Sequence, residues 1–120
     1  MLHRDIKPSN VMLGEGFDAK LGDFRLVWQV SYHDGVCTPC ITMIGSMDYM
    51  DPQYIETGTL SPASDIYSLG LVPLEVATGV RPIVPRRVAH RNTLIAAIRE
   101  SYSKKAILEI VDERMRGELK

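Results

Sequence analysis

Four polar residues near the start of the chain have the types and the spacing to support one reaction. Asp5 could accept a proton from a hydroxyl nucleophile, and Lys7, two positions later, could neutralise a phosphate. Asn10 and Asp23 carry the oxygen ligands that Mg²⁺ accepts while it keeps waters and substrate phosphates. Phosphoryl transfer depends mainly on positioning and charge neutralisation, and these groups supply both. The spacing therefore predicts a phosphoryl-transfer site.

The elements that must position these residues are short at the start of the chain. Two apolar stretches, 11–13 and 19–21, flank a connection that contains Gly14 and Gly16, and this pattern predicts a small β-hairpin. Residues 28–46 contain Gly, Pro, Ser and Thr without clear periodicity, so we expect a long loop there.

Longer helices are predicted in the second half of the chain. Ser61 and Pro62 suit a helix start, and the residues that follow are apolar on nearly every side as far as Thr78. A helix that is apolar all round is expected to be buried, so we predict a central buried helix over about 62–78. Apolar residues at helical spacing predict a later helix over about 92–103. The predicted fold class is mainly α-helical with a small β-hairpin.

Composition excludes several classes of protein. The 120 residues carry 14 Lys and Arg against 15 Asp and Glu, so a net charge of −1 gives no support for nucleic-acid binding. No apolar run approaches the ~18 residues of a membrane span. Cys37 and Cys40 form a CxxC with His33 nearby, but a structural zinc site needs four ligands. We therefore interpret the cysteines as reduced thiols in a loop.

The ordered motifs resemble eukaryotic protein kinases. Residues 3–10, followed by Asp23-Phe24, resemble the catalytic loop and the metal-binding segment of that family. Residues 45–53 resemble the end of the activation segment, and residues 64–70 resemble the start of the large central helix of the kinase C-lobe. Lys7 matches the pattern of serine/threonine kinases, and the residues of these motifs are most similar to those of plant receptor-like kinases of the legume-lectin type.

The resemblance implies catalytic roles for the matching residues. Asp5 would be the catalytic base and Lys7 the γ-phosphate contact, with Asn10 and Asp23 as the ligands of Mg²⁺. Met12 would lie under the adenine of ATP. The implied cofactors are thus ATP and Mg²⁺, and the implied partner is a protein substrate or a related kinase.

The resemblance also implies structural and docking roles. His3 and Phe24 would stack in the hydrophobic column that marks the active state. Asp65 would hold the catalytic loop through its backbone N–H groups. Ser46 would take the place of the threonine that helps to dock a substrate hydroxyl.

Regulation by phosphate is implied by Arg4, which precedes the presumed base. An Arg that faces a phosphorylated Ser or Thr makes charge-assisted hydrogen bonds that order the segment. Thr38 and Thr42 are the candidate phosphate acceptors.

The resemblance covers roughly the middle 40% of a kinase domain, judged by typical domain size. It assigns residues 3–13 to the catalytic loop and residues 21–53 to the metal-binding and activation segment. The N-lobe, with its Gly-rich loop and strand lysine, and the last C-lobe helices are expected to be absent. On this reading the chain is a truncated Ser/Thr kinase domain, weak or inactive.

Four substitutions strengthen that expectation. Arg25 replaces the glycine after Asp23-Phe24 and should crowd the metal site. Asp48 replaces a second family glycine, and Gln53 replaces a glutamate that forms a buried ion pair. Pro73 falls in the middle of the central helix, where it removes a hydrogen bond at a cost of ~3 kcal/mol.

Two alternatives stay open. The chain could be a pseudokinase-like interaction module that uses the Ser46 loop and the helix with Leu94 and Ile98, although a packing face is the commoner explanation of that helix. It could instead belong to a longer, active receptor-like kinase whose start is misplaced. The chain as written is expected in the cytoplasm, and a longer receptor kinase would place it on the cytoplasmic side of the plasma membrane.

Overall fold

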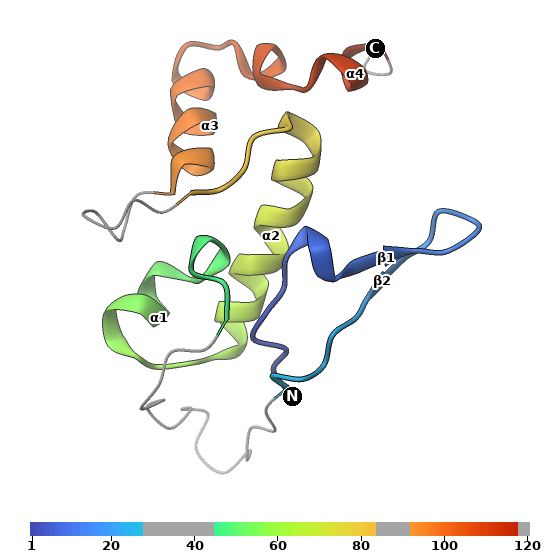
Figure 1. Ribbon diagram of the computed structural model, residues 1–120. Coiled ribbons are helices and arrows are strands. Elements are labelled where there is room, and N and C mark those ends of the chain that lie inside the picture. The colour runs from blue at the N-terminus through green and yellow to red at the C-terminus, as the bar shows by residue number, and fades with distance from the viewer. Residues whose placement is uncertain (28–44, 84–91, 118–120) are drawn as a thin grey trace. The chain divides into compact units, whose positions relative to one another are not determined.

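The computed structural model describes residues 1–27, 45–83 and 92–117 (Figure 1). In this part of the chain the elements, in order, are η1 Pro8–Asn10, β1 Val11–Leu13, β2 Ala19–Leu21, η2 Met47–Tyr49, α1 Pro52–Thr57, α2 Pro62–Thr78, α3 Thr93–Ser103, η3 Ile107–Ile110 and α4 Glu113–Arg116. Most of these elements are helical, and β1 and β2 form an antiparallel pair, so the predicted fold class is confirmed. The chain divides into two compact units, Met1–Val72 and Pro73–Lys120.

The predicted hairpin is present and has a tight turn. Val11 pairs with Leu21 and Leu13 pairs with Ala19. The turn is closed by the Gly14 N–H, which donates to the Asp18 carbonyl at 2.9 Å. A β-carbon at Gly14 would lie 2.6 Å from a carboxylate oxygen of Asp18, so a larger residue there would require the exposed Asp18 side chain to move.

The core of the first unit joins segments that are far apart in the sequence. Leu2, Met50, Tyr54 and Leu60 form one buried apolar cluster, and Ile55 packs against it. Leu2 directly precedes the polar residues at the start of the chain, whereas Met50 follows the segment that contains Ser46. Burial of these apolar side chains therefore brings the two polar segments to one place.

Local capping sets the start and end of α1. The Asp51 carboxylate accepts a hydrogen bond from the Gln53 N–H at 3.0 Å, which satisfies a free donor of the first turn. Gly58 ends the helix with a φ of 68°, a left-handed conformation that glycine adopts without strain. Gln53 itself is exposed.

Helix α2 is less buried than its sequence predicts. Leu71 is buried, but Ile66 and Leu69 are 68% and 55% exposed, so the expectation of a helix buried on every side is wrong. Apolar periodicity alone cannot show which faces meet other elements. The helix continues through Pro73, which lies at the first position of the second unit.

The second unit is held by capping and by two buried side chains. The Asn92 side chain accepts from the Leu94 N–H at 3.1 Å and so caps α3. Leu94 is completely buried, as is Pro82. Leu94 is therefore a packing residue, as the commoner explanation of this helix expects. The Asp112 N–H donates to the Ala77 carbonyl at 2.9 Å and links the end of α2 to the segment before α4.

Among the described residues, no helix combines the length and the apolar character that crossing a membrane would require.

Candidate functional site

The predicted catalytic segment turns sharply before β1. Lys7 is extended, Pro8 occupies the first turn of η1, and the Asn10 N–H donates to the Lys7 carbonyl at 3.0 Å. Proline suits this position because its fixed φ is compatible with the first turn and its missing N–H is not needed there. The turn carries Asn10 back toward Asp5.

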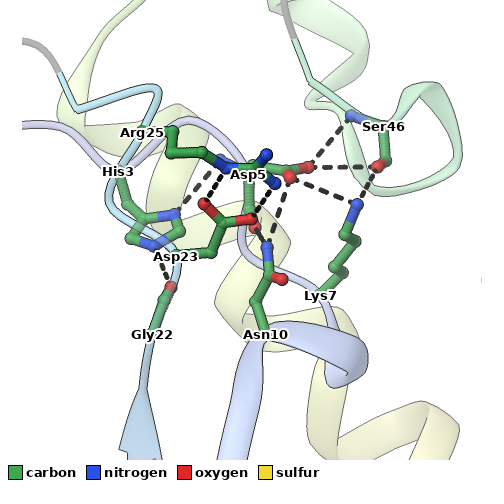
Figure 2. A network of polar contacts seen from close by, with 8 residues as sticks. All are labelled: His3, Asp5, Lys7, Asn10, Gly22, Asp23, Arg25 and Ser46. Carbon is green, nitrogen blue, oxygen red and sulfur yellow. Dashed lines mark hydrogen bonds and ion pairs between the residues drawn. The ribbon is translucent and has the colours of Figure 1, made fainter.

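Asp5 is the centre of a polar cluster that draws on two distant segments (Figure 2). Its carboxylate lies 3.1 Å from the Lys7 Nζ and accepts from the Asn10 Nδ2 at 3.2 Å. The Ser46 backbone N–H and hydroxyl donate to the Asp5 Oδ1 at 3.2 and 3.0 Å. Lys7 also donates to the Ser46 Oγ at 2.8 Å. Both side chains of the charged pair are mostly shielded from solvent, with exposures of 26% for Lys7 and 12% for Asp5.

These contacts keep Asp5 ionised. Burial raises the pKa of its carboxyl, but the hydrogen bonds from Lys7 and Ser46, the charge of Lys7 and the amide of Asn10 outweigh burial, so the net pKa is lowered. A carboxylate held in this way is a hydrogen-bond acceptor at neutral pH.

Asp65, in the first turns of α2, holds the other end of the same segment. Its carboxylate accepts from the His3 N–H at 2.6 Å and from the Arg4 N–H at 3.0 Å. Arg4 has a φ of 69°, which is strained for a residue with a side chain. Its Nε donates to the Leu26 carbonyl at 2.5 Å. The surrounding hydrogen bonds therefore fix a backbone conformation that Arg4 would not adopt alone.

His3 connects this segment to the residues that follow β2. Its Nε2 lies 2.8 Å from the Gly22 carbonyl oxygen, and its ring meets the Phe24 ring edge to face, with centroids 5.3 Å apart. The Gly22 N–H in turn donates to the Asn10 carbonyl at 2.7 Å. These contacts set the backbone on both sides of Asp23.

Asp23 is engaged by a neighbour rather than left open. Arg25 donates from Nε to the Asp23 Oδ1 at 2.7 Å and from Nη2 to Oδ2 at 2.6 Å. The hydrogen bonds from Arg25 lower the pKa of Asp23 to about 2, with a further contribution from the charge of Lys7. Since both carboxylate oxygens already accept from a cation, the donor set as arranged does not fit Mg²⁺, which needs such oxygens as ligands.

The predicted site residues fall into groups. Lys7, Asn10 and Ser46 all contact the Asp5 carboxylate, and Asp65 contacts the backbone of His3 and Arg4. Met12 is 60% exposed on the hairpin. Thr38 and Thr42, as well as the pair Cys37 and Cys40 with His33, lie outside the described residues.

Three contacts of the site were not anticipated from the sequence. They are the fork of Arg25 on both oxygens of Asp23, the carbonyl of Gly22 beside the His3 ring, and the carbonyl of Leu26 that receives Arg4. The spacing of Asp23 and Arg25 is a signal for the first, because residues two apart in a turn can pair. Every residue has a backbone carbonyl, so the sequence contains no signal for the contacts of the Gly22 and Leu26 carbonyls.

Comparison with known proteins identifies the family to which the chain is similar. The family model described as the protein kinase domain matches residues 1–117. The chain is 41% identical over 118 residues to the L-type lectin-domain containing receptor kinase IX.1 of Arabidopsis thaliana, covering 97% of this chain and 18% of that protein. It is 39% identical over 119 residues to the L-type lectin-domain containing receptor kinase S.7 of Oryza sativa subsp. japonica, covering 98% of this chain and 16% of that protein. The chain thus spans less than a fifth of the length of these relatives.

Proposed function

Because the chain belongs to the protein kinase domain family and is similar to plant lectin receptor kinases, we propose that it is part of a Ser/Thr kinase domain with one half of its site formed and the other half closed. The formed half is the cluster that would receive a substrate hydroxyl. The closed half is the metal side, where the Asp23 carboxylate that would hold a metal ion is paired with Arg25. The chain is therefore a weak or inactive phosphotransferase whose partner is a protein with Ser or Thr hydroxyls.

The observation that carries the proposal is the environment of Asp5. Its ionised carboxylate already accepts from the Ser46 hydroxyl at 3.0 Å, so the pocket is chemically suited to a hydroxyl group. A Ser or Thr hydroxyl of a substrate that reached the same carboxylate would find an acceptor for its proton. Asp5 would be the base in that role, and Ser46 would orient the incoming hydroxyl.

Lys7 would supply charge beside the reacting groups. Its Nζ lies 3.1 Å from Asp5 and 2.8 Å from the Ser46 Oγ, so it stands next to the place where a hydroxyl would bind. Kinases use ATP with Mg²⁺ and depend on such cations to stabilise charge on the transferred phosphoryl group. The Asn10 Nδ2 donates a hydrogen bond to the Asp5 carbonyl at 2.8 Å and so fixes the backbone of this segment.

The expected weakness follows from Asp23. The carboxylate that would take a metal is paired with Arg25, whereas the metal is a principal source of charge neutralisation in phosphoryl transfer. In this arrangement no catalytic step can use a metal ion at Asp23, because both of its carboxylate oxygens accept from Arg25.

A phosphotransfer assay tests the proposal. The purified chain is incubated with γ-labelled ATP, Mg²⁺ and a library of Ser- and Thr-containing peptides, with Asp5→Ala as the matched control. We expect incorporation no greater than that of the control. Strong incorporation that disappears in Asp5→Ala would show an active kinase and contradict the closed metal half.

A second candidate function is a non-catalytic interaction module, which the engaged state of Asp23 favours. Such a module would bind hydroxyl-bearing peptides through Asp5 and Ser46 without turnover. Fluorescence anisotropy with labelled Ser and Thr peptides, compared with matched Ala peptides, measures this directly. Equal affinity for the Ser and Ala peptides would exclude hydroxyl recognition at this cluster.

A further inference from the structure

We propose that Arg25 acts as a built-in counter-cation of Asp23, so that its guanidinium competes with divalent metal ions for that carboxylate. The inference rests on the proposed function only in taking Asp23 as the carboxylate of the metal side. It concerns the resident cation of the site, and its test does not depend on any reaction.

The pairing satisfies both oxygens of the carboxylate. Arg25 donates from Nε to Oδ1 at 2.7 Å and from Nη2 to Oδ2 at 2.6 Å, which is the parallel, two-bond arrangement of an arginine fork. Only arginine presents two donors in a plane that matches a carboxylate, since lysine offers a single point charge. The fork thus occupies both oxygens that a metal ion would use.

The exposures of the two side chains indicate that Arg25 lies between the Asp23 carboxylate and solvent. The Arg25 side chain is 84% exposed, whereas that of Asp23 is 24% exposed. Arg25 therefore covers the carboxylate from the solvent side, which is the side from which a hydrated ion would approach. Figure 2 shows the Arg25 side chain paired with Asp23.

The backbone presents the two side chains to each other. Asp23 has a φ of 56°, in the left-handed region that Asp tolerates better than most residues. The residues before it are fixed by the Gly22 N–H, which donates to the Asn10 carbonyl at 2.7 Å. The backbone before Asp23 is therefore tied to the last residue of η1, which fixes the place from which the Asp23 side chain meets Arg25.

The charge balance of the surroundings points the same way. Asp5 and Asp23 contribute two negative charges, and Lys7 and Arg25 contribute two positive charges, so the four groups sum to zero. A divalent cation would meet no excess of negative charge, and it would be repelled by two cations. Without the charge of Arg25 the same groups sum to −1, which favours a metal ion.

The test is Mn²⁺ binding, with Mn²⁺ as a spectroscopic substitute for Mg²⁺. Free Mn²⁺ is measured by electron paramagnetic resonance during titration of the unmodified chain, Arg25→Gly and Arg25→Met. Arg25→Met keeps a long side chain without the charge, so it separates electrostatics from backbone freedom. Because the pair is exposed on the arginine side, we expect a moderate gain, about five- to tenfold tighter binding in both variants.

Two controls decide where the gained metal binds. Addition of Asp23→Asn to Arg25→Met should return the affinity to that of the unmodified chain. Lys20→Met removes another exposed cation, a lysine whose Nζ lies 3.6 Å from the Asp18 carboxylate on the hairpin, and it should leave Mn²⁺ binding unchanged. Circular dichroism of each variant confirms that the fold is retained before titration.

Several outcomes would overturn the inference. Unmodified chain that binds Mn²⁺ as tightly as Arg25→Met would show that the fork does not compete. A gain that survives Asp23→Asn would place the metal elsewhere. By contrast, a gain of Mn²⁺ binding through Asp23 in Arg25→Met would support the counter-cation role even if every variant lacks phosphotransfer. The lack of phosphotransfer would then bear only on the kinase reaction.

Discussion

The strongest structural prediction concerns Asp65, which joins α2 to the segment that carries Asp5. Its carboxylate accepts from the backbone N–H groups of His3 and Arg4, 62 and 61 positions away in sequence. Replacing Asp65 by Ala removes both acceptors and leaves two partly buried donors without that carboxylate. Replacing it by Asn keeps one acceptor oxygen and loses the charge.

The magnitude follows from the bonds and from the strain that they hold. Hydrogen bonds to a charged group contribute ~1.5–3 kcal/mol each, so two contribute ~3–6 kcal/mol. Part of this is recovered when Arg4, at a φ of 69°, relaxes from a conformation that costs ~1–2 kcal/mol. Because both bonds are only partly buried, we take about 4 kcal/mol for the pair, and subtracting the strain of ~1–2 kcal/mol leaves ~2–3 kcal/mol. We therefore expect Asp65→Ala to lower the local opening free energy by this amount, and Asp65→Asn by about half as much.

Native-state hydrogen exchange measures this change at the atoms concerned. A loss of ~2–3 kcal/mol corresponds to about 30- to 160-fold faster exchange of the His3 and Arg4 amides, if exchange occurs through local opening. Amides in the hairpin β1–β2 should change much less. Glu56→Gln, which alters an exposed carboxylate on α1, is the matched control and should leave the His3 amide unchanged.

Two results would refute the reasoning. Unchanged exchange of both amides in Asp65→Ala would show that the carboxylate does not hold the segment. An increase shared equally by every amide of the first unit would show global destabilisation instead of a local anchor. The strain term is tested separately, since Asp65→Ala should cost more in an Arg4→Gly background, where glycine adopts a φ of 69° without strain and relaxation recovers nothing.

Three further predictions follow from single contacts. Pro73→Ala should raise the free energy of unfolding by up to ~3 kcal/mol, because α2 continues through Pro73 without the hydrogen bond that its N–H would make; an unchanged urea midpoint would contradict this. Asn92→Ala should lower the stability of α3 by ~1 kcal/mol through loss of the cap on the Leu94 N–H, and Asn92→Asp should retain it, as measured by chemical denaturation. The pKa of Asp23 is depressed from 3.8 to about 2 by Arg25, so the stabilisation from this pair is complete above about pH 4 and is lost as pH falls through about 2. Carboxyl-carbon NMR should show that low titration midpoint in the unmodified chain and a midpoint closer to 3.8 in Arg25→Met; equal midpoints would exclude Arg25 as the cause.

Local features of the fold could be predicted because their causes lie within a few residues. Glycines between two apolar triplets predicted the hairpin, and its turn closes between Gly14 and Asp18. Ser61 and Pro62 predicted a helix start, and α2 begins at Pro62. The degree of burial of α2 could not be predicted, since Ile66 and Leu69 have the same apolar character as Leu71 but face solvent.

The candidate site divides in the same way. The order and types of the polar residues, and hence the kinase resemblance, follow from the amino-acid sequence, because motif spacing is a property of the chain. The contact of Ser46 with Asp5 across 41 positions, and that of Asp65 with the backbone at His3 and Arg4, arise only when the chain folds. The folded chain also pairs the exposed Arg25 side chain with both carboxylate oxygens of Asp23. The physical reason is that such contacts depend on where burial of Leu2, Met50, Tyr54 and Leu60 brings distant segments together, and on which backbone angles the resulting hydrogen bonds can hold.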